Sequence, residues 1–156
     1  MQVHFKDIEH IILETLDMGK AFKIHPNGIR KEPLIHQGRD AVFIKKPEGR
    51  LKKYDIAFFK RKNGEYVLHR VIKVLPDSYH FCGDNQWQVE KGIEDSQIIG
   101  IVTKLEINGK TITTDDKEYL DYSKKRVDSR VWRNFWTIVK HFFKKVKIKL
   151  KRIISK

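Results

Sequence analysis

A histidine and an aspartate are the first candidates for chemistry in this chain. His69 lies in the otherwise apolar and basic run Tyr66 to Val74, and Asp84 follows fifteen residues later in a Gly-Asp-Asn turn. A histidine oriented by a carboxylate can take the proton from a serine hydroxyl and so create a nucleophile for acyl transfer. The first serine of the sequence is Ser78, however, so none precedes the histidine. The pair therefore lacks the nucleophile that this chemistry needs.

Both residues also have an ordinary structural interpretation. In an extended strand His69 shares one face with its apolar second neighbours, and Arg70 lies on the opposite face. A lone histidine on an apolar face is more often a hydrogen-bonded core residue than a catalyst. An aspartate in a Gly-Asp-Asn turn most often accepts hydrogen bonds from nearby backbone N–H groups.

Short β-type segments separated by turn residues occupy the middle of the chain. The predicted strands are Ala21 to His25, Asp40 to Lys45, Asp55 to Arg61, Tyr66 to Leu75, Ser78 to Cys82, Ile98 to Ile107 and Lys110 to Thr114. Asn63-Gly64 and Asn108-Gly109 favour the positive φ values of tight hairpins, and Pro76-Asp77 favours a turn. Short strands without helices between them predict a coiled or barrel-like antiparallel sheet.

A helix and a long loop complete this part of the prediction. Apolar residues recur at helical spacing from Phe5 to Met18, and Gly19 suits the end of a helix that packs on the β region. The apolar stripe consists of Phe5, Ile8, Ile11, Ile12 and Leu16. The segment His25 to Asp40, with two prolines and two glycines, is expected to be a functional or mobile loop. Gly83 to Ser96 is expected to be a second irregular stretch.

Five motifs follow one another between residues 28 and 102. They are Gly28…Pro33-Leu34-Ile35…Gly38-Arg39-Asp40-Ala41-Val42, then Leu51…Tyr54-Asp55-Ile56-Ala57-Phe58-Phe59, Tyr66-Val67-Leu68-His69-Arg70-Val71, Gly83-Asp84-Asn85 and Ile98-Ile99-Gly100-Ile101-Val102. In this order they resemble the superfamily of serine peptidases that includes type I signal peptidases and LexA-type repressors. The resemblance covers about residues 21 to 107 and is closest to small members whose general base is histidine. It implies a coiled antiparallel β-sheet, in agreement with the predicted strands.

The resemblance also implies that the nucleophile has been lost. In active members the first motif has the form G-x-S-M-x-P, and alignment on Gly28 and Pro33 places Arg30 at the serine position and Lys31 at the methionine position. A guanidinium stays charged and cannot act as a nucleophile. An arginine there would instead pair with the aspartate of the Gly-Asp-Asn turn or with a ligand carboxylate.

What the resemblance leaves is a groove for a peptide. Active relatives hold an extended substrate along a strand edge, by backbone hydrogen bonds that survive loss of the serine. His69 and Asp84, with Arg30 at the serine position, are then vestigial catalytic residues. The residues expected to line the groove are Gly28, Ile29, Lys31, Pro33, Asp40 and Asn85.

The composition indicates in which compartment the protein works and which cofactors it can bind. The single cysteine, Cys82, excludes an internal disulfide and a cysteine-based zinc site, and we expect no metal and no cofactor. No apolar run approaches the roughly 20 residues that span a bilayer, and the first residues do not read as a signal peptide. We expect a cytoplasmic protein, peripheral on the inner face of a membrane.

The formal charge of +13 lies almost wholly in the C-terminal tail. Residues 124–156 carry 13 Lys and Arg against one acid, Asp128, which gives +12; the other 123 residues hold 20 basic and 19 acidic side chains, which gives +1. The body is therefore electrically balanced, and the tail is the part suited to an anionic partner.

Apolar side chains in the tail recur every three or four residues, as in an amphipathic helix of about six turns. They are Trp132, Trp136, Val139, Phe143, Val146, Leu150 and Ile153. The segment Lys145 to Lys151 also alternates with the period of a strand, but the longer pattern that runs through it favours helix. We expect the first half of this helix, with Trp132, Phe135 and Trp136, to dock on the body.

Two partners suit the cationic face of that helix. On an anionic membrane each lysine near the surface contributes roughly 1 kcal/mol. Nucleic acid phosphates are the other possibility, and we rank the membrane above them because lysine outnumbers arginine and the stripe is strongly apolar. The residues expected to contact the membrane are Trp136, Lys140, Phe143, Lys144, Lys147, Leu150 and Lys151.

These patterns together predict a mainly β protein in three parts: an N-terminal helix (1–20), a signal-peptidase-like β domain (21–114) and a basic aromatic tail (115–156). The expected function is that of a catalytically inactive pseudopeptidase that binds a peptide or protein segment. One alternative is an active serine peptidase with an unrecognised nucleophile. A second is a DNA-associated regulator, although some twenty residues before the β region leave no room for a helix-turn-helix domain. The sequence leaves the oligomeric state open.

Overall fold

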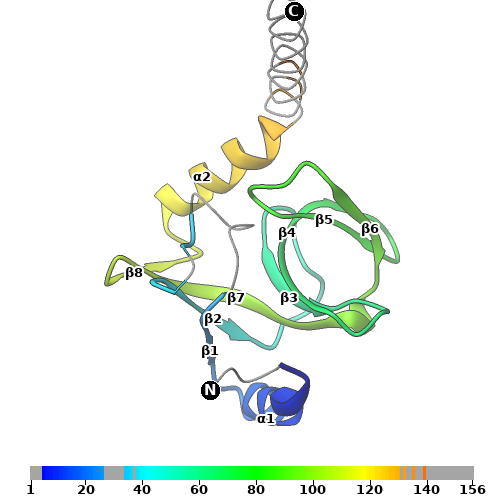
Figure 1. Ribbon diagram of the computed structural model, residues 1–156, viewed down its shortest axis with the longest axis vertical. Helices are drawn as coiled ribbons and strands as arrows, with labels where there is room; N and C mark the ends of the chain where they lie inside the picture. The colour runs from blue at the N-terminus through cyan, green and yellow to red at the C-terminus, as the bar shows by residue number, and fades with distance from the viewer. Residues whose placement is uncertain are drawn as a thin grey trace, which may run out of the picture.

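One antiparallel sheet with two α-helices accounts for most of the structure (Figure 1). The computed structural model describes residues 5–26, 34–36, 38–130, 132, 135 and 139. The helices are α1 (Phe5–Asp17) and α2 (Lys117–Asp128), and a short 3-10 helix, η2, covers Asp95–Gln97. The strands are β1 (Phe22–Ile24), β2 (Ala41–Lys45), β3 (Ile56–Lys60), β4 (Tyr66–Val74), β5 (Tyr79–Cys82), β6 (Val89–Ile93), β7 (Ile98–Ile107) and β8 (Lys110–Thr113). The prediction of a mainly β protein is confirmed.

The sheet is strongly curved. Its strand order is β1-β2-β7-β3-β4-β5-β6, with β8 also paired to β7, and all of these neighbouring strands pair antiparallel. Figure 1 shows β3 to β6 curling round into a ring, with α1 and α2 towards opposite ends of the sheet. The register shifts in β2, β3, β4 and β5, as at bulges, which bend a strand and increase its twist.

The seven predicted strands are present, with ends that differ by at most one residue. The prediction of an irregular stretch from Gly83 to Ser96 is wrong in part, because it contains β6. That strand is the last in the sheet order, and its sequence Val-Glu-Lys-Gly-Ile lacks apolar alternation. Gly92 also has a φ of +70°, so the backbone departs from regular extended geometry within the strand.

The predicted turn between β7 and β8 has the expected geometry. Asn108 and Gly109 have φ values of 50° and 74°, so both central residues lie in the left-handed region that a tight two-residue hairpin requires. In the turn between β3 and β4 only Gly64 has a positive φ, of 86°. There the Glu65 N–H donates to Asn63 Oδ1 at 3.1 Å, so the asparagine acts through its side chain.

Gly19, just beyond the last residue of α1, caps the helix as predicted. The Gly19 N–H donates to the Leu16 carbonyl at 2.9 Å and the Lys20 N–H to the Thr15 carbonyl at 3.1 Å, and Gly19 has a φ of +73°. These bonds form the Schellman motif that satisfies the last carbonyls of a helix. Ile12 and Leu16 are buried against the sheet.

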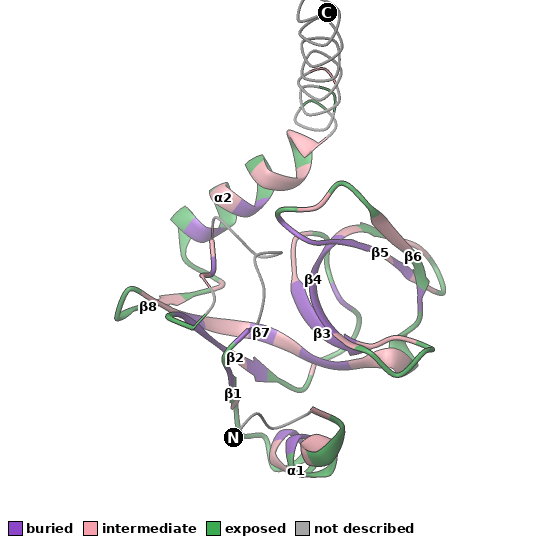
Figure 2. Cartoon of the chain, viewed as in Figure 1, coloured by how far each residue is buried: buried purple, intermediate pink, exposed green. Residues whose placement is uncertain are grey.

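Buried residues follow one another along much of β3, β4 and β5 (Figure 2). Their side chains form two hydrophobic cores, one on each face of the sheet. The helix-side core consists of Ile12, Leu16, Ile24, Ile35, Val42, Ile44, Ile56, Phe58, Leu68, Ile99, Val102, Leu105 and Tyr119. The inner core consists of Leu51, Ala57, Phe59, Val67, Val71, Tyr79, Phe81 and Ile93. Strand β4 supplies Leu68 to the helix-side core and Val67 and Val71 to the inner core, which confirms the predicted division of its faces.

Helix α2 occupies residues that the sequence analysis assigned to the tail. Asp116 is its N-cap residue, and Tyr119 and Ser123 are its buried residues. Lys125 and Arg126 lie in its last turn, where positive charges interact favourably with the helix dipole. Trp132 and Phe135 are 64% and 53% exposed and stack on each other with ring centroids 5.8 Å apart. The expectation that these two side chains dock on the body is therefore wrong, while Trp136 lies outside the described residues.

The other predicted tail contacts also lie outside the described residues; they are Lys140, Phe143, Lys144, Lys147, Leu150 and Lys151. So does most of the predicted basic C-terminal helix. Among the residues that the structure describes, none of the helices is long and apolar enough to cross a bilayer.

Candidate functional site

The predicted site residues separate into three groups in the structure. His69 lies on β4, and Asp84 and Asn85 follow β5. Asp40 immediately precedes β2. The residues of the expected nucleophile loop, Gly28, Ile29, Arg30, Lys31 and Pro33, lie outside the described residues.

Both ring nitrogens of His69 face acceptor oxygens. Nδ1 is 2.7 Å from the carbonyl oxygen of Leu68, and Nε2 is 3.2 Å from Glu90 Oε1 on β6. The second contact has the distance of an ion pair, but its angle falls outside hydrogen-bond geometry. The side chain is 1% exposed, and the Phe59 ring lies edge-on to it with centroids 6.3 Å apart. His69 is thus enclosed in the inner face of the curled sheet.

Glu90 is a site residue that the sequence analysis missed. Its carboxylate accepts hydrogen bonds from Arg61, with Nε to Oε2 at 2.9 Å, in addition to the contact with His69. Burial alone would raise the pKa of Glu90, but the contacts with His69 and Arg61 outweigh it and lower the pKa to about 2. The sequence signal for Glu90 was weak, because it required recognition of β6 and of its pairing with β5.

The geometry of His69 differs from that of a histidine base in a serine peptidase. A catalytic histidine directs one nitrogen to its carboxylate and keeps the other free to accept the proton of the nucleophile. In His69 the second nitrogen is held by the carbonyl of its own neighbour in the chain, Leu68. The arrangement resembles a histidine–carboxylate pair that has been turned into a structural contact.

Asp84 pairs with Arg70 rather than with His69. Arg70 Nε and Nη2 donate to the two carboxylate oxygens of Asp84 at 2.8 and 2.7 Å, and the arginine is 1% exposed. Neighbouring residues of a strand point to opposite faces, so a carboxylate that bonds Arg70 lies across the sheet from His69. The expected His69–Asp84 pair is therefore wrong.

Arg70 also joins two other parts of the chain, the segment before β3 and helix α2. Its Nη1 donates to the Tyr54 carbonyl at 3.0 Å, to Ser123 Oγ at 2.7 Å and to the Tyr119 hydroxyl at 3.3 Å. Tyr119 and Ser123 belong to α2, so the arginine fastens this helix to the sheet. Tyr54 holds a φ of +85°, a strained value for a tyrosine, in the position where its carbonyl meets the guanidinium. The sequence did contain a signal for this pair, because an arginine on an apolar strand requires a buried acid.

Asp40 is a structural residue and not part of an open groove. Its side chain is fully buried, and Arg39 Nε, the His36 N–H and the Asn108 N–H donate to it at 2.8, 2.8 and 3.2 Å. These bonds, of which that from Arg39 is the strongest, hold the pKa of Asp40 well below its usual range. The expectation that Asp40 lines a peptide groove is wrong. Asn85 is exposed beside the buried Asp84.

Removing the charge of Asp84 should destabilise the protein strongly. Asp84→Asn leaves the Arg70 guanidinium buried with a neutral partner, and we expect a loss of about 3 to 5 kcal/mol in the free energy of unfolding, measured by urea denaturation. The matched control is Asp128→Asn, which removes the exposed pair with Lys53 at 3.2 Å and should change stability by less than about 1 kcal/mol. Equal losses in the two variants would contradict a central role for the buried pair.

The contribution of Glu90 should depend on pH. A carboxyl with a lowered pKa stabilises the fold above its unfolded pKa, near 4.5, and this contribution is lost as the pH falls towards about 2. Glu90→Gln should therefore destabilise the protein at pH 7, by no more than about 3 kcal/mol, and the difference from wild type should shrink between pH 4.5 and 2. Urea denaturation at a series of pH values measures this. A difference that does not vary with pH would show that Glu90 acts through packing alone.

Comparison with known proteins adds no assignment to this geometry. No protein-family model, no curated protein and no solved structure matches the chain. Among the described residues, no group of three or more His, Cys, Asp or Glu side chains is placed to hold a metal ion. The chemistry of the site has to be argued from its residues.

Proposed function

We propose that this chain is a non-catalytic, peptide-binding protein similar to the signal-peptidase and LexA-type superfamily. The observation that carries the proposal is the position of the two His69 nitrogens, with Nδ1 2.7 Å from the Leu68 carbonyl oxygen and Nε2 3.2 Å from Glu90 Oε1, in a side chain that is 1% exposed. The superfamily motifs, with Arg30 in place of serine, and the curled antiparallel sheet support the same reading. A sheet of this kind without a nucleophile keeps the ability to pair with an extended peptide.

The alternative of an active peptidase needs another nucleophile. Cys82 is the one thiol of the chain, and it is 1% exposed. Its Sγ lies 3.3 Å from the carbonyl oxygens of Gln86 and Gln88. A reactive cysteine requires access and a cationic environment that favours the thiolate, and carbonyl oxygens around a buried thiol favour the protonated form. These contacts weigh against the enzyme alternative.

Wild-type protein should cut neither itself nor a diverse peptide library during long incubation, as followed by mass spectrometry. Ile29→Thr/Arg30→Ser/Lys31→Met restores the superfamily motif and is the matched test of the loop. Cleavage by this variant alone would mean that the missing serine accounts for inactivity. If the variant also cuts nothing, the contacts of the His69 imidazole are a second cause of inactivity. Cleavage by the wild type that His69→Ala abolishes would overturn the proposal.

A second candidate role is attachment to an anionic membrane surface. Trp87, in the β5–β6 connection, is 72% exposed, and Arg130 Nη1 lies 3.4 Å from its carbonyl oxygen. The stacked rings of Trp132 and Phe135 are exposed two and five residues beyond that arginine. Exposed aromatic rings beside a segment with 13 basic residues and one acid form the combination that binds at the interface of an anionic bilayer.

This role predicts binding to vesicles that contain phosphatidylserine and not to vesicles of phosphatidylcholine alone. Trp87→Ala/Trp132→Ala should reduce co-sedimentation several-fold, because the rings supply the apolar part of the affinity. Met18→Ala is the matched control, since Met18 is 68% exposed but directly follows α1, far along the chain from Trp87 and Trp132. Steeply salt-dependent binding to duplex DNA without vesicle binding would contradict the membrane role and favour a nucleic-acid partner.

A further inference from the structure

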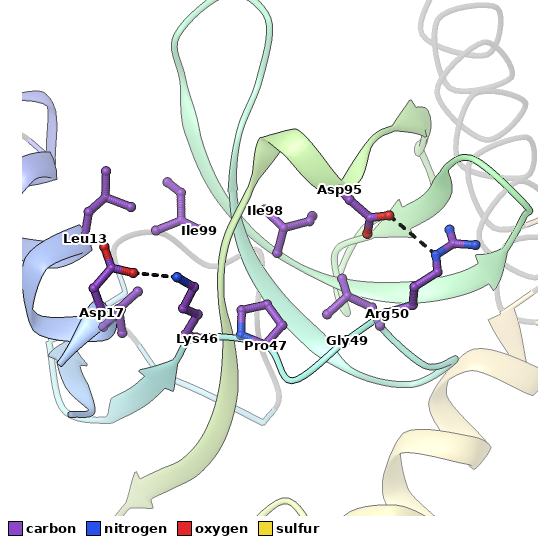
Figure 3. A pocket seen from close by; sticks show the side chains of 11 residues that line it. Leu13, Asp17, Lys46, Pro47, Gly49, Arg50, Asp95, Ile98 and Ile99 are labelled. Atoms are coloured by element: carbon purple, nitrogen blue, oxygen red, sulfur yellow. Dashed lines mark hydrogen bonds and ion pairs between the residues drawn. The ribbon is translucent and has the colours of Figure 1, made fainter. Parts of the chain in front are cut away.

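A groove of about 540 Å³ lies where β7 begins (Figure 3). Ile98 and Ile99 form its middle, with Leu13 of α1 on one side and Pro47 of the β2–β3 connection in front. Leu13 is 42% exposed, so its side chain is available to a ligand in the groove. The groove has the size and the apolar lining of a binding site.

The groove follows an open stretch of strand edge. Pairing between β2 and β7 ends with Lys45 opposite Ile101. On its other side β7 continues to pair with β3 as far as Ile98, opposite Phe59. Residues 98 and 99 therefore have a strand neighbour on the β3 side and the groove on the side where β2 has ended. An edge of this kind can take an added strand.

Gly100 marks the point where β2 and β7 separate. A Cβ atom built there would lie 3.1 Å from the Lys45 carbonyl oxygen and 3.2 Å from Ile44 Cδ1. The two strands are thus in tight contact at Gly100. One residue further along, the β2 chain has turned away through Lys46 and Pro47, which line the groove. The opening begins at a definite position in the sheet.

The charges of the groove are balanced. Lys46 Nζ pairs with Asp17 at 2.6 Å and Arg50 Nε with Asp95 at 3.5 Å, one pair on each side of the isoleucines (Figure 3). Two cations and two carboxylates leave no net charge to attract an anion, so the lining suits an uncharged ligand. Both side chains of the Lys46–Asp17 pair are more than 60% exposed, so the pair contributes little to stability and a ligand can displace it.

We propose that this groove binds an extended, uncharged peptide segment by strand addition to the beginning of β7. The peptide backbone pairs with residues 98 and 99, and one apolar side chain of the peptide rests against Leu13 and Ile99 on the helix side of the sheet. This inference rests on the proposed peptide-binding function and assigns it a site that does not involve His69. Specificity then comes from one apolar side chain and from the exclusion of charge.

The test uses the full chain, labelled with ¹⁵N, and capped pentapeptides of the form acetyl-Ala-Thr-X-Thr-Ala-amide. Leucine, valine or phenylalanine at X should bind and shift the amide resonances of residues 46, 48–51 and 98–99. Aspartate at X should weaken binding. Leu13→Gln should weaken the leucine peptide about tenfold, the loss expected when an apolar contact is removed.

Ile11→Gln is the matched control, because Ile11 is 45% exposed on the same helix and does not line the groove. It should bind the leucine peptide as the wild type does. If the peptides bind but shift the amide resonances of β6 instead, or if Leu13→Gln leaves their affinity unchanged, the groove is not the binding site. The proposed peptide-binding function would still stand in either case. Absence of binding by all three apolar peptides would overturn both.

Discussion

The buried pair of Arg70 and Asp84 is the interaction on which the arrangement of the other elements depends. Removing two charges from water is unfavourable, and such a pair persists only where hydrogen bonds satisfy the remaining donors. Here Tyr54, Tyr119 and Ser123 complete the guanidinium shell. One side chain thus ties β4, the β5–β6 connection and α2 together. The inner face of the sheet can then remain a hydrophobic core, because this charge is satisfied on the other face.

The neighbouring histidine has the opposite surroundings and, we propose, a reduced role. His69 lies among the aromatic rings of the inner core, where Glu90 and the Leu68 carbonyl occupy its nitrogens. In the proposed role these contacts hold the ring in place and leave neither nitrogen facing a nucleophile. In this interpretation the protein has kept a peptidase-like sheet, and His69 and Asp84 now stabilise the fold. Recognition of a partner then falls to the strand edges and to the aromatic and basic surface near Trp87.

The sequence predicted the elements better than the contacts between them. The hydrophobic alternation of β4, the helix end at Gly19 and the Asn108-Gly109 turn are local properties, and the structure has them. The partners of His69 and Asp84 depend on which strands lie side by side and in what register. That register shifts between Val71 and Lys73 in β4, and again in β5, and the sequence has no pattern that predicts these irregularities. Strand β6 was missed for a related reason, since its residues bear charges and a glycine rather than an apolar period.

The alternation of β4 sets a limit on how this sequence can diverge. His69 and Arg70 are consecutive, yet each serves a different face of the sheet with a different acid. Substitutions elsewhere in the strand leave that division intact. An insertion or deletion of one residue upstream within the strand would exchange the faces, placing a guanidinium among the aromatic rings and an imidazole opposite Asp84. Homologous chains should therefore vary in length at the turns on either side of β4 and keep a constant spacing within it.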